Sequence, residues 1–571
     1  MKKESITKSY TKQFYKKNKI NFGFAFTEVI FVTAISLIIS WLLQQIIDLI
    51  AGNNTVFELY QLGLIALGGI LLMVMAYIIS YLSKPKFITK GISQYKEYIF
   101  EKLTKKKISA FLGEDSSKYI SALTNDIATI EKGYLWNLFQ IVGMSVLFLG
   151  ALGLMLYYSP ILTGIAIGLS VIPVIASILA GNKMAKAEKE VSDQNEVYTA
   201  TIKDTLGGFS VIKSFRVEAQ SIKNFKAGVK KLAACQSKKQ KMQIIMEMFS
   251  NLSGIFVQIG IFILGAYFAL TGQGVTAGTT LVFVQLLNYI LNPIGTMPQL
   301  LSERKAAKGL IEKIAKELEQ NVREENTISI EKLSNEIKIE NLHFGYTEEK
   351  EILHGISHSF KLGKKYAIVG TSGSGKSTLL NLLMASHSNY TGSIAYDSTE
   401  IKDINSDSLY DIQSIIQQNV FIFNTTIKEN ITMFQDFTEE EINNAILMSG
   451  LKELVDEKGL DYKCGENGSG LSGGEKQRIS IARSLLRKSQ VLLVDEATAA
   501  LDAETAYQVS NSILHLDGVT CIAVTHSLEE GLLKQYDEII TLKSGNIIEV
   551  GSFDELINQK GYFYSLFTIS Q

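Results

Sequence analysis

The chain has 571 residues, of which 46% are hydrophobic, and its mean hydropathy is positive. It is too long for one domain and too apolar for an ordinary soluble protein, so a membrane part and a soluble part are expected. A formal net charge of −1, with no basic block carrying interleaved aromatic residues, argues against a nucleic-acid partner. Cys235, Cys464 and Cys521 are scattered without metal-site spacing, so neither a zinc site nor a disulfide is expected.

Long apolar stretches occupy the first half of the chain. A helix that crosses the hydrocarbon of a bilayer needs about 20 mostly apolar residues. The polar, Lys-rich segment 1–19 comes first, and the apolar stretch after it is too long for the core of a cleaved signal peptide. We therefore predict a six-helix α transmembrane domain over residues 1–305. Its spans are expected at about 22–50, 59–83, 133–157, 160–182, 246–270 and 277–301.

The distribution of positive charge predicts the orientation of these spans. The loops 51–55, 157–159 and 271–277 contain no Lys or Arg, whereas the connecting segments 84–132 and 183–241 contain many. By the positive-inside rule, both termini are cytoplasmic and the two basic segments are long intracellular loops, which also read as helical. Lys greatly outnumbers Arg, as is typical of an AT-rich bacterium. A multi-pass protein of the bacterial cell membrane is predicted.

A charged helical linker over residues 306–329 is followed by a change of pattern. From 330 to 571, short β-rich runs alternate with helices, which is typical of an α/β domain with a parallel sheet. One glycine-rich stretch fits the phosphate-binding pattern G-x-x-x-x-G-K-[ST] between a strand and a helix. It consists of Gly370, Thr371, Ser372, Gly373, Ser374, Gly375, Lys376 and Ser377, followed by Thr378. The second domain is therefore predicted to be an α/β P-loop nucleotide-binding domain.

The residue types of this loop indicate how it binds a nucleotide triphosphate. Glycines let backbone amides close around the phosphates, Lys376 reaches the β and γ phosphates, and the Ser377 hydroxyl completes the Mg²⁺ shell. The apolar run 491–494 reads as a buried strand that ends in two acids. It would deliver Asp495 to the Mg²⁺ and Glu496 to a water beside the γ-phosphate. An acidic pair at a strand end would be weak evidence without the loop.

In their order along the chain, these motifs resemble those of the ATP-binding cassette (ABC) superfamily, specifically its half-transporters of the exporter fold. The resemblance extends over nearly the whole chain. Its signature motif, which in that family contacts ATP held by the opposite subunit, is matched by Leu471, Ser472, Gly473, Gly474 and Glu475. The family usually has Gln at the fifth position. We expect Glu475 to reduce activity at most, because the serine and both glycines are intact.

The resemblance also implies roles for single residues that would otherwise read as packing or surface positions. It implies that Gln418 contacts Mg²⁺ or the lytic water, that His526 contacts the γ-phosphate, and that Tyr346 stacks on adenine. Asp502 is implied to lie in a loop at the dimer interface. The implied ligands are ATP and Mg²⁺. The implied magnesium residues are Ser377, Gln418 and Asp495, and the implied catalytic residues are Glu496 and His526.

The predicted function is ATP-driven export of a peptide, lipophilic drug or lipid across the plasma membrane by alternating access. The family's unit has two ATP sites, so this chain needs a second half-transporter, as a homodimer or a heterodimer. Two alternatives remain open: import of a chelated metal or other solute on the same fold, and a non-transporting ATPase that senses a ligand. Intramembrane Gln258, Gln285, Asn288 and Asn292 either line a cavity or hydrogen-bond between helices.

Overall fold

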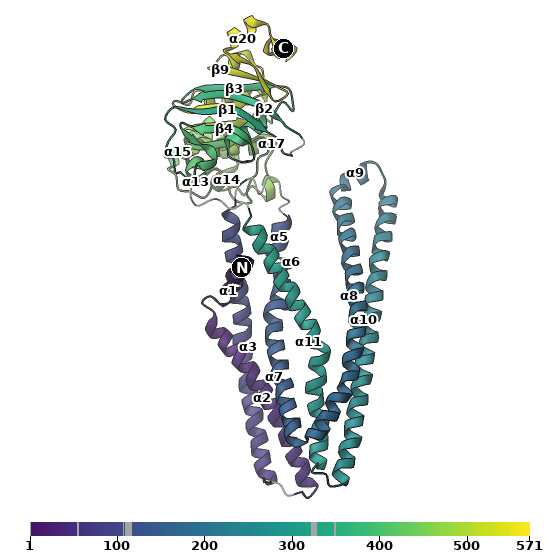
Figure 1. The fold of residues 1–571 in the computed structure, drawn as a ribbon. Coiled ribbons are helices and arrows are strands. Elements are labelled where there is room, and N and C mark those ends of the chain that lie inside the picture. The colour runs from purple at the N-terminus through teal and green to yellow at the C-terminus, as the bar shows by residue number, and fades with distance from the viewer. Residues whose placement is uncertain are drawn as a thin grey trace. The chain divides into compact units, whose positions relative to one another are not determined.

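The structure is a computed structural model of the chain, and it describes residues 2–53, 56–106, 108, 117–320, 328–347, 350–498 and 500–570. These residues form two compact units (Figure 1). The first contains the helices from α1 to α11, and the second contains the elements from β1 to α21.

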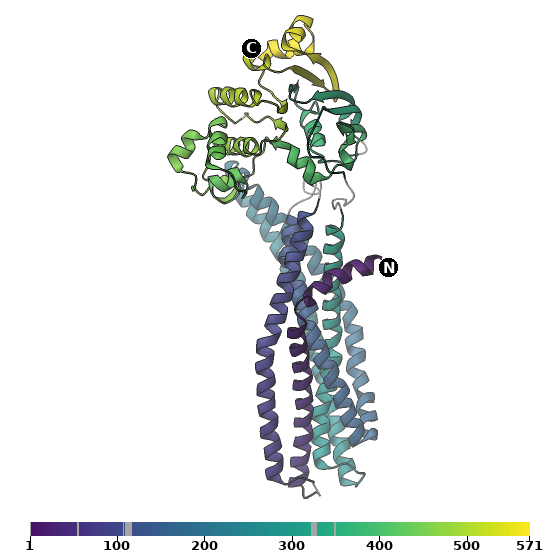
Figure 2. The same ribbon diagram turned by 90° about the vertical axis from the view of Figure 1, so that its left-hand side faces the viewer.

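The first unit is entirely helical within the described residues. Its long helices are α2 (Lys19–Ile50), α3 (Leu59–Thr104), α7 (Asn137–Tyr158), α8 (Pro160–Gly207), α10 (Glu218–Leu270) and α11 (Ala277–Leu318). Its short helices are α1 (Lys2–Lys12), η1 (Gln13–Tyr15), α5 (Ser117–Leu123), α6 (Asn125–Ile130), the π-helical η2 (Glu131–Trp136) and α9 (Phe209–Ser214). The short helix α1 lies across the long helices rather than along them (Figure 2).

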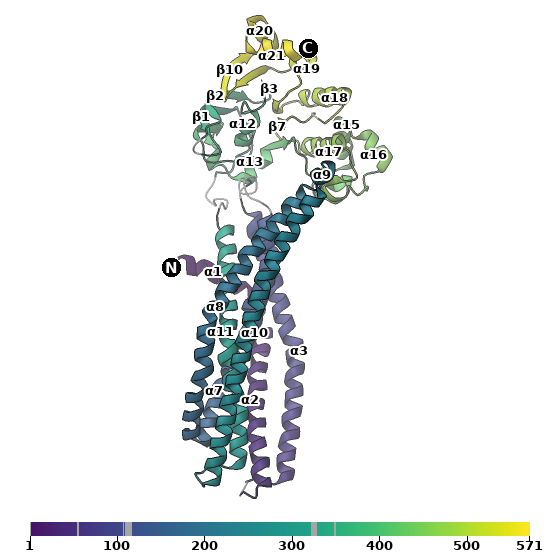
Figure 3. The same ribbon diagram turned by 90° about the vertical axis from the view of Figure 1, so that its right-hand side faces the viewer.

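Five helical stretches of the described residues are long and apolar enough to cross a membrane. They are Lys19–Ile50, Leu59–Thr104, Lys118–Tyr158, Glu218–Leu270 and Ala277–Leu318. Helix α8 adds the shorter apolar stretch Pro160–Val171. The expected spans fall in α2, α3, η2 with α7, α8, α10 and α11. Helices α8 and α10 run side by side and are joined through α9 (Figures 1 and 3).

The reversal between α7 and α8 is a helix stop and start with only one residue between them. Ser159 ends α7 and accepts a hydrogen bond from the Leu162 amide (3.3 Å) as the N-cap of α8. Pro160 occupies the first helical position, where its missing N–H costs nothing. The local sequence therefore turns the chain within a single residue.

Polar side chains of the membrane helices are used in packing. Gln258 Nε2 donates to Asn288 Oδ1 (2.6 Å), which joins α10 to α11, so for this pair interhelical hydrogen bonding is the observed role. Glu28 is buried on α2 and forms an ion pair with Lys84 of α3 (2.6 Å between Oε2 and Nζ). Buried charges in such helices require a partner of this kind.

A third polar cluster joins the C-terminal end of α2 to the start of α11. The buried Asp48 carboxylate accepts hydrogen bonds from the Gly278 amide (3.0 Å) and the Thr276 hydroxyl (2.9 Å), and also from Gln44. A negative charge at a helix N-terminus complements the helix dipole and satisfies amides that have no partner within the helix. Asp48 therefore fixes the two helix ends to each other.

Helix α11 runs on into the segment expected to be a charged helical linker. That linker is expected from residue 306, and α11 continues without a break to Leu318. Its last turns bury Ala307, Ile311, Ile314 and Ala315, which recur at helical spacing. The first part of the expected linker is thus an integral helix of the first unit. Residues 321–327 of that stretch lie outside the described residues.

The second unit contains two sheets. The first is antiparallel with order β2-β1-β4-β5, formed by β1 (Glu336–Phe344), β2 (Leu353–Lys361), β4 (Thr391–Tyr396) and β5 (Thr399–Glu400). The second has order β10-β9-β3-β8-β7-β6. Its strands are β3 (Lys365–Gly370), β6 (Gln413–Ile416), β7 (Val491–Asp495), β8 (Thr520–Val524), β9 (Glu538–Lys543) and β10 (Asn546–Gly551).

The second sheet is parallel from β9 to β6, and only β10 is antiparallel to its neighbour. Strands β3 and β8 are buried along nearly their whole length, which explains their continuous apolar sequence. The main core of this unit joins both sheets to α12. The helices are α12 (Lys376–Leu383), α13 (Ser406–Ile412), α14 (Ile427–Thr432), α15 (Glu439–Met448), α16 (Lys452–Lys458), α17 (Gly473–Leu486), α18 (Ala503–Leu514), α19 (Glu530–Leu533), α20 (Phe553–Gln559) and α21 (Tyr562–Ser570). Two single 3₁₀ turns are η3 (Ile401–Asp403) and η4 (Glu466–Gly468).

Candidate nucleotide site

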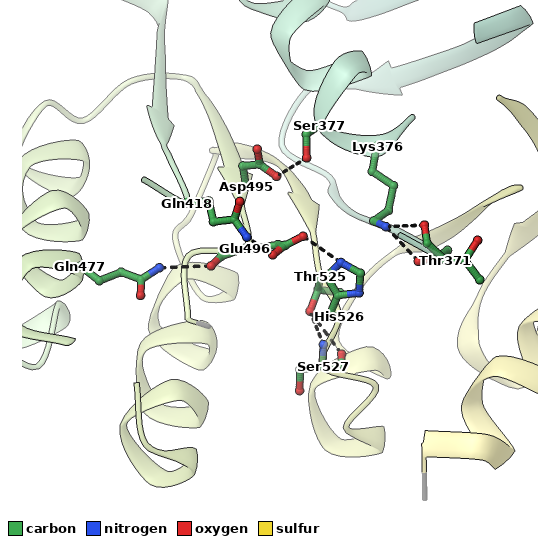
Figure 4. Close-up of polar contacts among 11 residues, drawn as sticks. Thr371, Lys376, Ser377, Gln418, Gln477, Asp495, Glu496, Thr525, His526 and Ser527 are labelled. Atoms are coloured by element: carbon green, nitrogen blue, oxygen red, sulfur yellow. Dashed lines mark hydrogen bonds and ion pairs between the residues drawn. The ribbon is translucent and has the colours of Figure 1, made fainter. Parts of the chain in front are cut away.

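The candidate residues meet at one edge of the parallel sheet. Strands β3, β8, β7 and β6 are consecutive neighbours, so their carboxyl ends lie side by side. Lys376 begins the helix that follows β3, and the loops after β8, β7 and β6 carry His526, Glu496 and Gln418, respectively. Ligands of open α/β sheets bind at this edge. Figure 4 shows the side chains that converge there.

The loop between β3 and α12 has the conformation of a phosphate cradle. Gly375 has φ +102° at the N-cap of α12, and a Cβ there would lie 2.7 Å from Leu353 Cδ2, so this turn requires glycine. Lys376 is buried and folds back over the loop. Its Nζ donates to the carbonyl oxygens of Gly370 (2.9 Å) and Thr371 (3.0 Å). The ammonium is thus held inside the loop by neutral acceptors.

The electrostatics of the loop suit an anionic ligand. Burial lowers the pKa of Lys376, so its charge is poorly compensated by what surrounds it. The buried Ser374 hydroxyl has no hydrogen-bond partner among the described residues. A cation amid backbone amides at a helix N-terminus, with a spare hydroxyl, is a donor set that fits phosphate oxygens.

A hydroxyl and a carboxylate from two different elements form the candidate metal position. Ser377 Oγ, at the start of α12, donates to Asp495 Oδ1 (2.9 Å), at the end of β7. Burial raises the pKa of Asp495, and the neighbouring Glu496 charge raises it further, against the opposing hydrogen bond from Ser377. Oxygen ligands of this kind, beside a phosphate site, suit Mg²⁺. The residues therefore fit a magnesium ion.

Glu496 is held from two sides by the loops after β6 and β8. Gln418 Nε2 donates to Glu496 Oε2 (2.5 Å), and His526 Nε2 lies 2.8 Å from Glu496 Oε1 (Figure 4). The backbone of Glu496 has φ +50°, a conformation that non-glycine residues adopt mainly where the surroundings enforce it. Its amide donates to the Val524 carbonyl (3.1 Å), which fixes the chain after β7 against β8.

Gln477 braces this loop, and it is absent from the sequence-based predictions. Its buried side chain donates through Nε2 to the Glu496 carbonyl (3.1 Å) and accepts through Oε1 from the Ala500 amide (3.1 Å). Gln477 lies on α17, which begins with the signature motif. It therefore ties the signature helix to the strand end that carries both acids. The one hint in the sequence was that Gln477 lies two residues after Glu475 of the signature motif. Nothing local to Gln477 shows that its side chain would be buried against the loop after β7.

The signature motif forms the exposed start of α17. Ser472 is the N-cap, and its Oγ accepts from the Glu475 amide (3.2 Å). Glu475 Oε2 accepts in return from the Ser472 amide (2.7 Å), which completes a capping box. Ser472 and Gly473 are exposed, whereas Leu471 is buried. The unusual glutamate is thus a regular part of the helix start.

Two further predicted residues lie on other loops of the unit. Tyr346 is 53% exposed, and its ring stands edge-on to those of Phe344 (5.1 Å between centroids) and His387 (5.4 Å). Its hydroxyl lies 3.3 Å from Thr378 Oγ1, beside the phosphate loop. Asp502 is exposed and caps α18 by accepting from the Thr505 amide (2.9 Å).

The structure thus brings most of the predicted residues together and leaves two groups apart. Polar contacts join Ser377 to Asp495 and join Glu496 to Gln418 and His526. Among the described residues, no hydrogen bond or ion pair connects the signature motif or Asp502 to the phosphate loop. A phosphate cradle beside paired acids, in a chain with a helical apolar unit, defines a membrane-bound nucleotide triphosphatase.

Comparisons with known proteins narrow this class. The family model for the ABC transporter transmembrane region matches residues 22–294, and a second family model, described as ABC transporter, matches residues 353–499. An uncharacterized ABC transporter ATP-binding protein, YfiC of Bacillus subtilis, is 30% identical over 497 residues, which cover 84% of this chain and 80% of that protein. An ATP-dependent lipid A-core flippase of Desulfotalea psychrophila is 28% identical over 572 residues, covering 96% and 97%.

A solved structure shows the same fold over nearly the whole chain. It is that of a bacterial Atm1-family ABC exporter with ATP bound, with a TM-score of 0.85 at 21% identity, covering 96% of this chain and 99% of the other. The chain therefore belongs to the ABC transporter family. It is a multi-pass membrane protein with the exporter fold of a half-transporter, and an ATP-hydrolysing transport ATPase.

Proposed function

We propose that this protein is one half of a dimeric exporter that moves a lipid, a lipophilic drug or a peptide out of the cytoplasm by alternating access. The observation that carries the proposal is the arrangement of Glu496 between Gln418 and His526, beside the Ser377–Asp495 pair. A site with its acid, amide and imidazole in contact is equipped for hydrolysis. The protein is therefore more than a nucleotide-binding scaffold.

Each predicted residue has a place in this proposal. Lys376 and the amides of residues 370–378 bind the β and γ phosphates, and Tyr346 stacks on the adenine. Ser377, Asp495 and Gln418 hold the Mg²⁺, which when bound screens the phosphate charge. Glu496 orients and deprotonates the attacking water, and His526 contacts the γ-phosphate.

The separation of the signature motif from the phosphate loop supports a dimer. The exposed Ser472 hydroxyl and the amides of Gly473 and Gly474 at the start of α17 can bind an anion, yet within the described part of the chain no hydrogen bond or ion pair joins them to this chain's own phosphate loop. A second nucleotide-binding domain, turned to face the first, would supply the missing phosphates. Asp502, exposed at the start of α18, would lie at the same interface. ATP would then act as the ligand that closes the two halves.

The lipid class is the first substrate to test, because several relatives are named lipid A-core flippases. Purified protein is reconstituted into vesicles that carry a fluorescent phospholipid analogue in both leaflets. ATP supplied outside reaches only those molecules whose nucleotide-binding domain faces out. Export predicts ATP-dependent movement of the probe into the inner leaflet, where an impermeant quencher cannot reach it. The Glu496→Gln variant is the matched control and should move none.

Other outcomes decide against the proposal. Movement of the probe toward the ATP side would indicate an importer. A ligand that changes the ATPase rate while no lipid, drug or peptide moves would indicate a sensor. The same vesicles also test orientation, since protease added outside should remove the termini only from molecules that respond to external ATP.

A further inference from the structure

Glu475 is the position at which this chain departs from the signature of its family, and the structure gives its carboxylate a cationic neighbour. Lys458 Nζ lies 3.6 Å from Glu475 Oε1. The two side chains are only 21% and 18% exposed, so the pair is mostly shielded from solvent. The other carboxylate oxygen, Oε2, is occupied by the Ser472 amide.

Lys458 also contacts the other end of the signature turn. It is the last residue of α16, and its Nζ donates to the Gly470 carbonyl (3.3 Å), which the Tyr462 hydroxyl approaches as well (3.4 Å). The ammonium lies 5.2 Å from the centre of the Tyr462 ring. The Lys458 ammonium therefore bridges the Gly470 carbonyl and the Glu475 carboxylate, which lie at the two ends of the signature motif.

The negative charge of Glu475 would repel a phosphate at the start of α17, and the contact with Lys458 offsets this repulsion. The start of α17 attracts anions through its free amides, and Ser472 is exposed there. A carboxylate in the first turn stabilises the helix, but it also repels a polyphosphate that approaches the same amides. A neutral glutamine would make the same capping box without this repulsion.

We propose that Lys458 is a positioning residue for ATP, which neutralises Glu475 and holds the signature turn open to the phosphates of the second subunit. The proposal rests on the dimeric ATP site proposed above and deepens it. Lys458 and Glu475 act as one unit: together they replace the neutral residue usual at this position. Lys458 touches no phosphate itself.

The test is a double-mutant cycle in the full-length protein, reconstituted in lipid nanodiscs, with KM for ATP and kcat measured at low and high salt. Lys458→Gln leaves the carboxylate uncompensated. A like charge roughly 10 Å from a phosphate, at the effective dielectric of a protein surface, raises KM roughly tenfold. The change in kcat should be smaller. High salt should shrink the effect, because about 0.5 M salt screens charges beyond a few ångströms.

The double variant decides between charge and structure. Lys458→Gln with Glu475→Gln should return KM to within about twofold of the wild type, since the capping box survives and no net charge is added. Lys452→Gln is the matched control, because it removes the same charge from the exposed start of α16. It should behave as the wild type.

Three results would overturn the proposal. An unchanged KM in Lys458→Gln would show that Glu475 does not need compensation. A double variant as impaired as Lys458→Gln would show that the lysine acts through Gly470 alone. If the wild type neither hydrolyses ATP nor is thermally stabilised by it, the proposed dimeric ATP site is refuted, and the proposed role of Lys458 is refuted with it. Normal hydrolysis with either of the first two results would leave the proposed function standing and refute only the role of Lys458.

Discussion

Replacement of Gln477 by leucine should weaken the site without touching any residue that contacts ATP. Leucine keeps most of the volume but loses both hydrogen bonds, to the Glu496 carbonyl and from the Ala500 amide, each 3.1 Å long. At about 1 kcal/mol for each bond, the nucleotide-binding domain should lose about 2 kcal/mol of stability. For a domain of 150–250 residues, this lowers the thermal midpoint by about 4–8 °C.

The effect on catalysis follows from the backbone of Glu496. Its φ of +50° is an unfavourable conformation that costs about 1–3 kcal/mol and depends on its surroundings. Without Gln477, the loop can relax and move the carboxylate, and a misplacement of about 1 Å can reduce the rate roughly a hundredfold. We therefore expect kcat to fall by about ten- to a hundredfold, with KM for ATP nearly unchanged.

Both tryptophans, Trp41 and Trp136, lie in the first unit, so tryptophan fluorescence does not report on this loop. Thermal unfolding should be followed by circular dichroism, and local opening by amide hydrogen exchange over residues 491–502. Gln508→Leu is the matched control, since Gln508 is exposed on α18. A Gln477→Leu protein with wild-type exchange in this segment, a wild-type midpoint and a wild-type kcat would refute the bracing role.

Three other changes test separate parts of the structure. Tyr346→Ala should raise KM for ATP by about tenfold, because stacking on a base contributes about 1–3 kcal/mol. Tyr346→Phe keeps the ring, so its KM should stay close to that of the wild type. Equal KM values for the two variants would exclude stacking. Gly278→Ala should lower the thermal midpoint of the membrane unit, because its Cβ would lie 2.5 Å from the Gln44 carbonyl, while Gly68→Ala, with open space around it, should not; equal midpoints for the two variants would contradict this. Burial lowers the pKa of His387 below its ordinary value, so the neutral ring stabilises the fold above about pH 6.5 and this stability is lost as the pH falls through the lowered pKa. His387→Phe should lose less of its thermal midpoint between pH 7 and pH 5 than the wild type does, and an equal loss would show that this histidine does not control acid stability.

Much of the architecture could be predicted because strong local patterns carry it. Apolar runs of membrane length are local, because one stretch of sequence shows whether its side chains suit the hydrocarbon of a bilayer. The phosphate loop is similarly local: the turn at Gly375 and the ammonium of Lys376 belong to one contiguous stretch. The contacts of Glu496 with Gln418 and His526 could be expected only from the resemblance to the ABC superfamily. The three residues follow the ends of three strands that lie far apart in the sequence.

The residues that were not predicted act through contacts with residues far away in the sequence, which no local pattern indicates. Asp48 falls inside the first expected span, about 22–50, and carries no motif, whereas its partners Thr276 and Gly278 lie at the start of α11, 228 and 230 residues away. Gln477 and Lys458 likewise act on segments separated from them in sequence. The helix that continues α11 to Leu318 is different, because a helical linker was expected there and the spacing of Ile311, Ile314 and Leu318 is a local helical pattern.

The most direct test of the account is the ATPase rate of this chain, purified alone in lipid nanodiscs, with Glu496→Gln prepared in parallel. The account predicts steady hydrolysis by the wild type and a loss of at least a hundredfold in the variant, since a positioned general base contributes about 10²–10⁴ in rate. Hydrolysis that is equal in both proteins would contradict the role of Glu496 and point to a contaminating activity. No hydrolysis in the wild type, with or without lipids, would contradict a self-sufficient pair of sites and require a second half-transporter of different sequence.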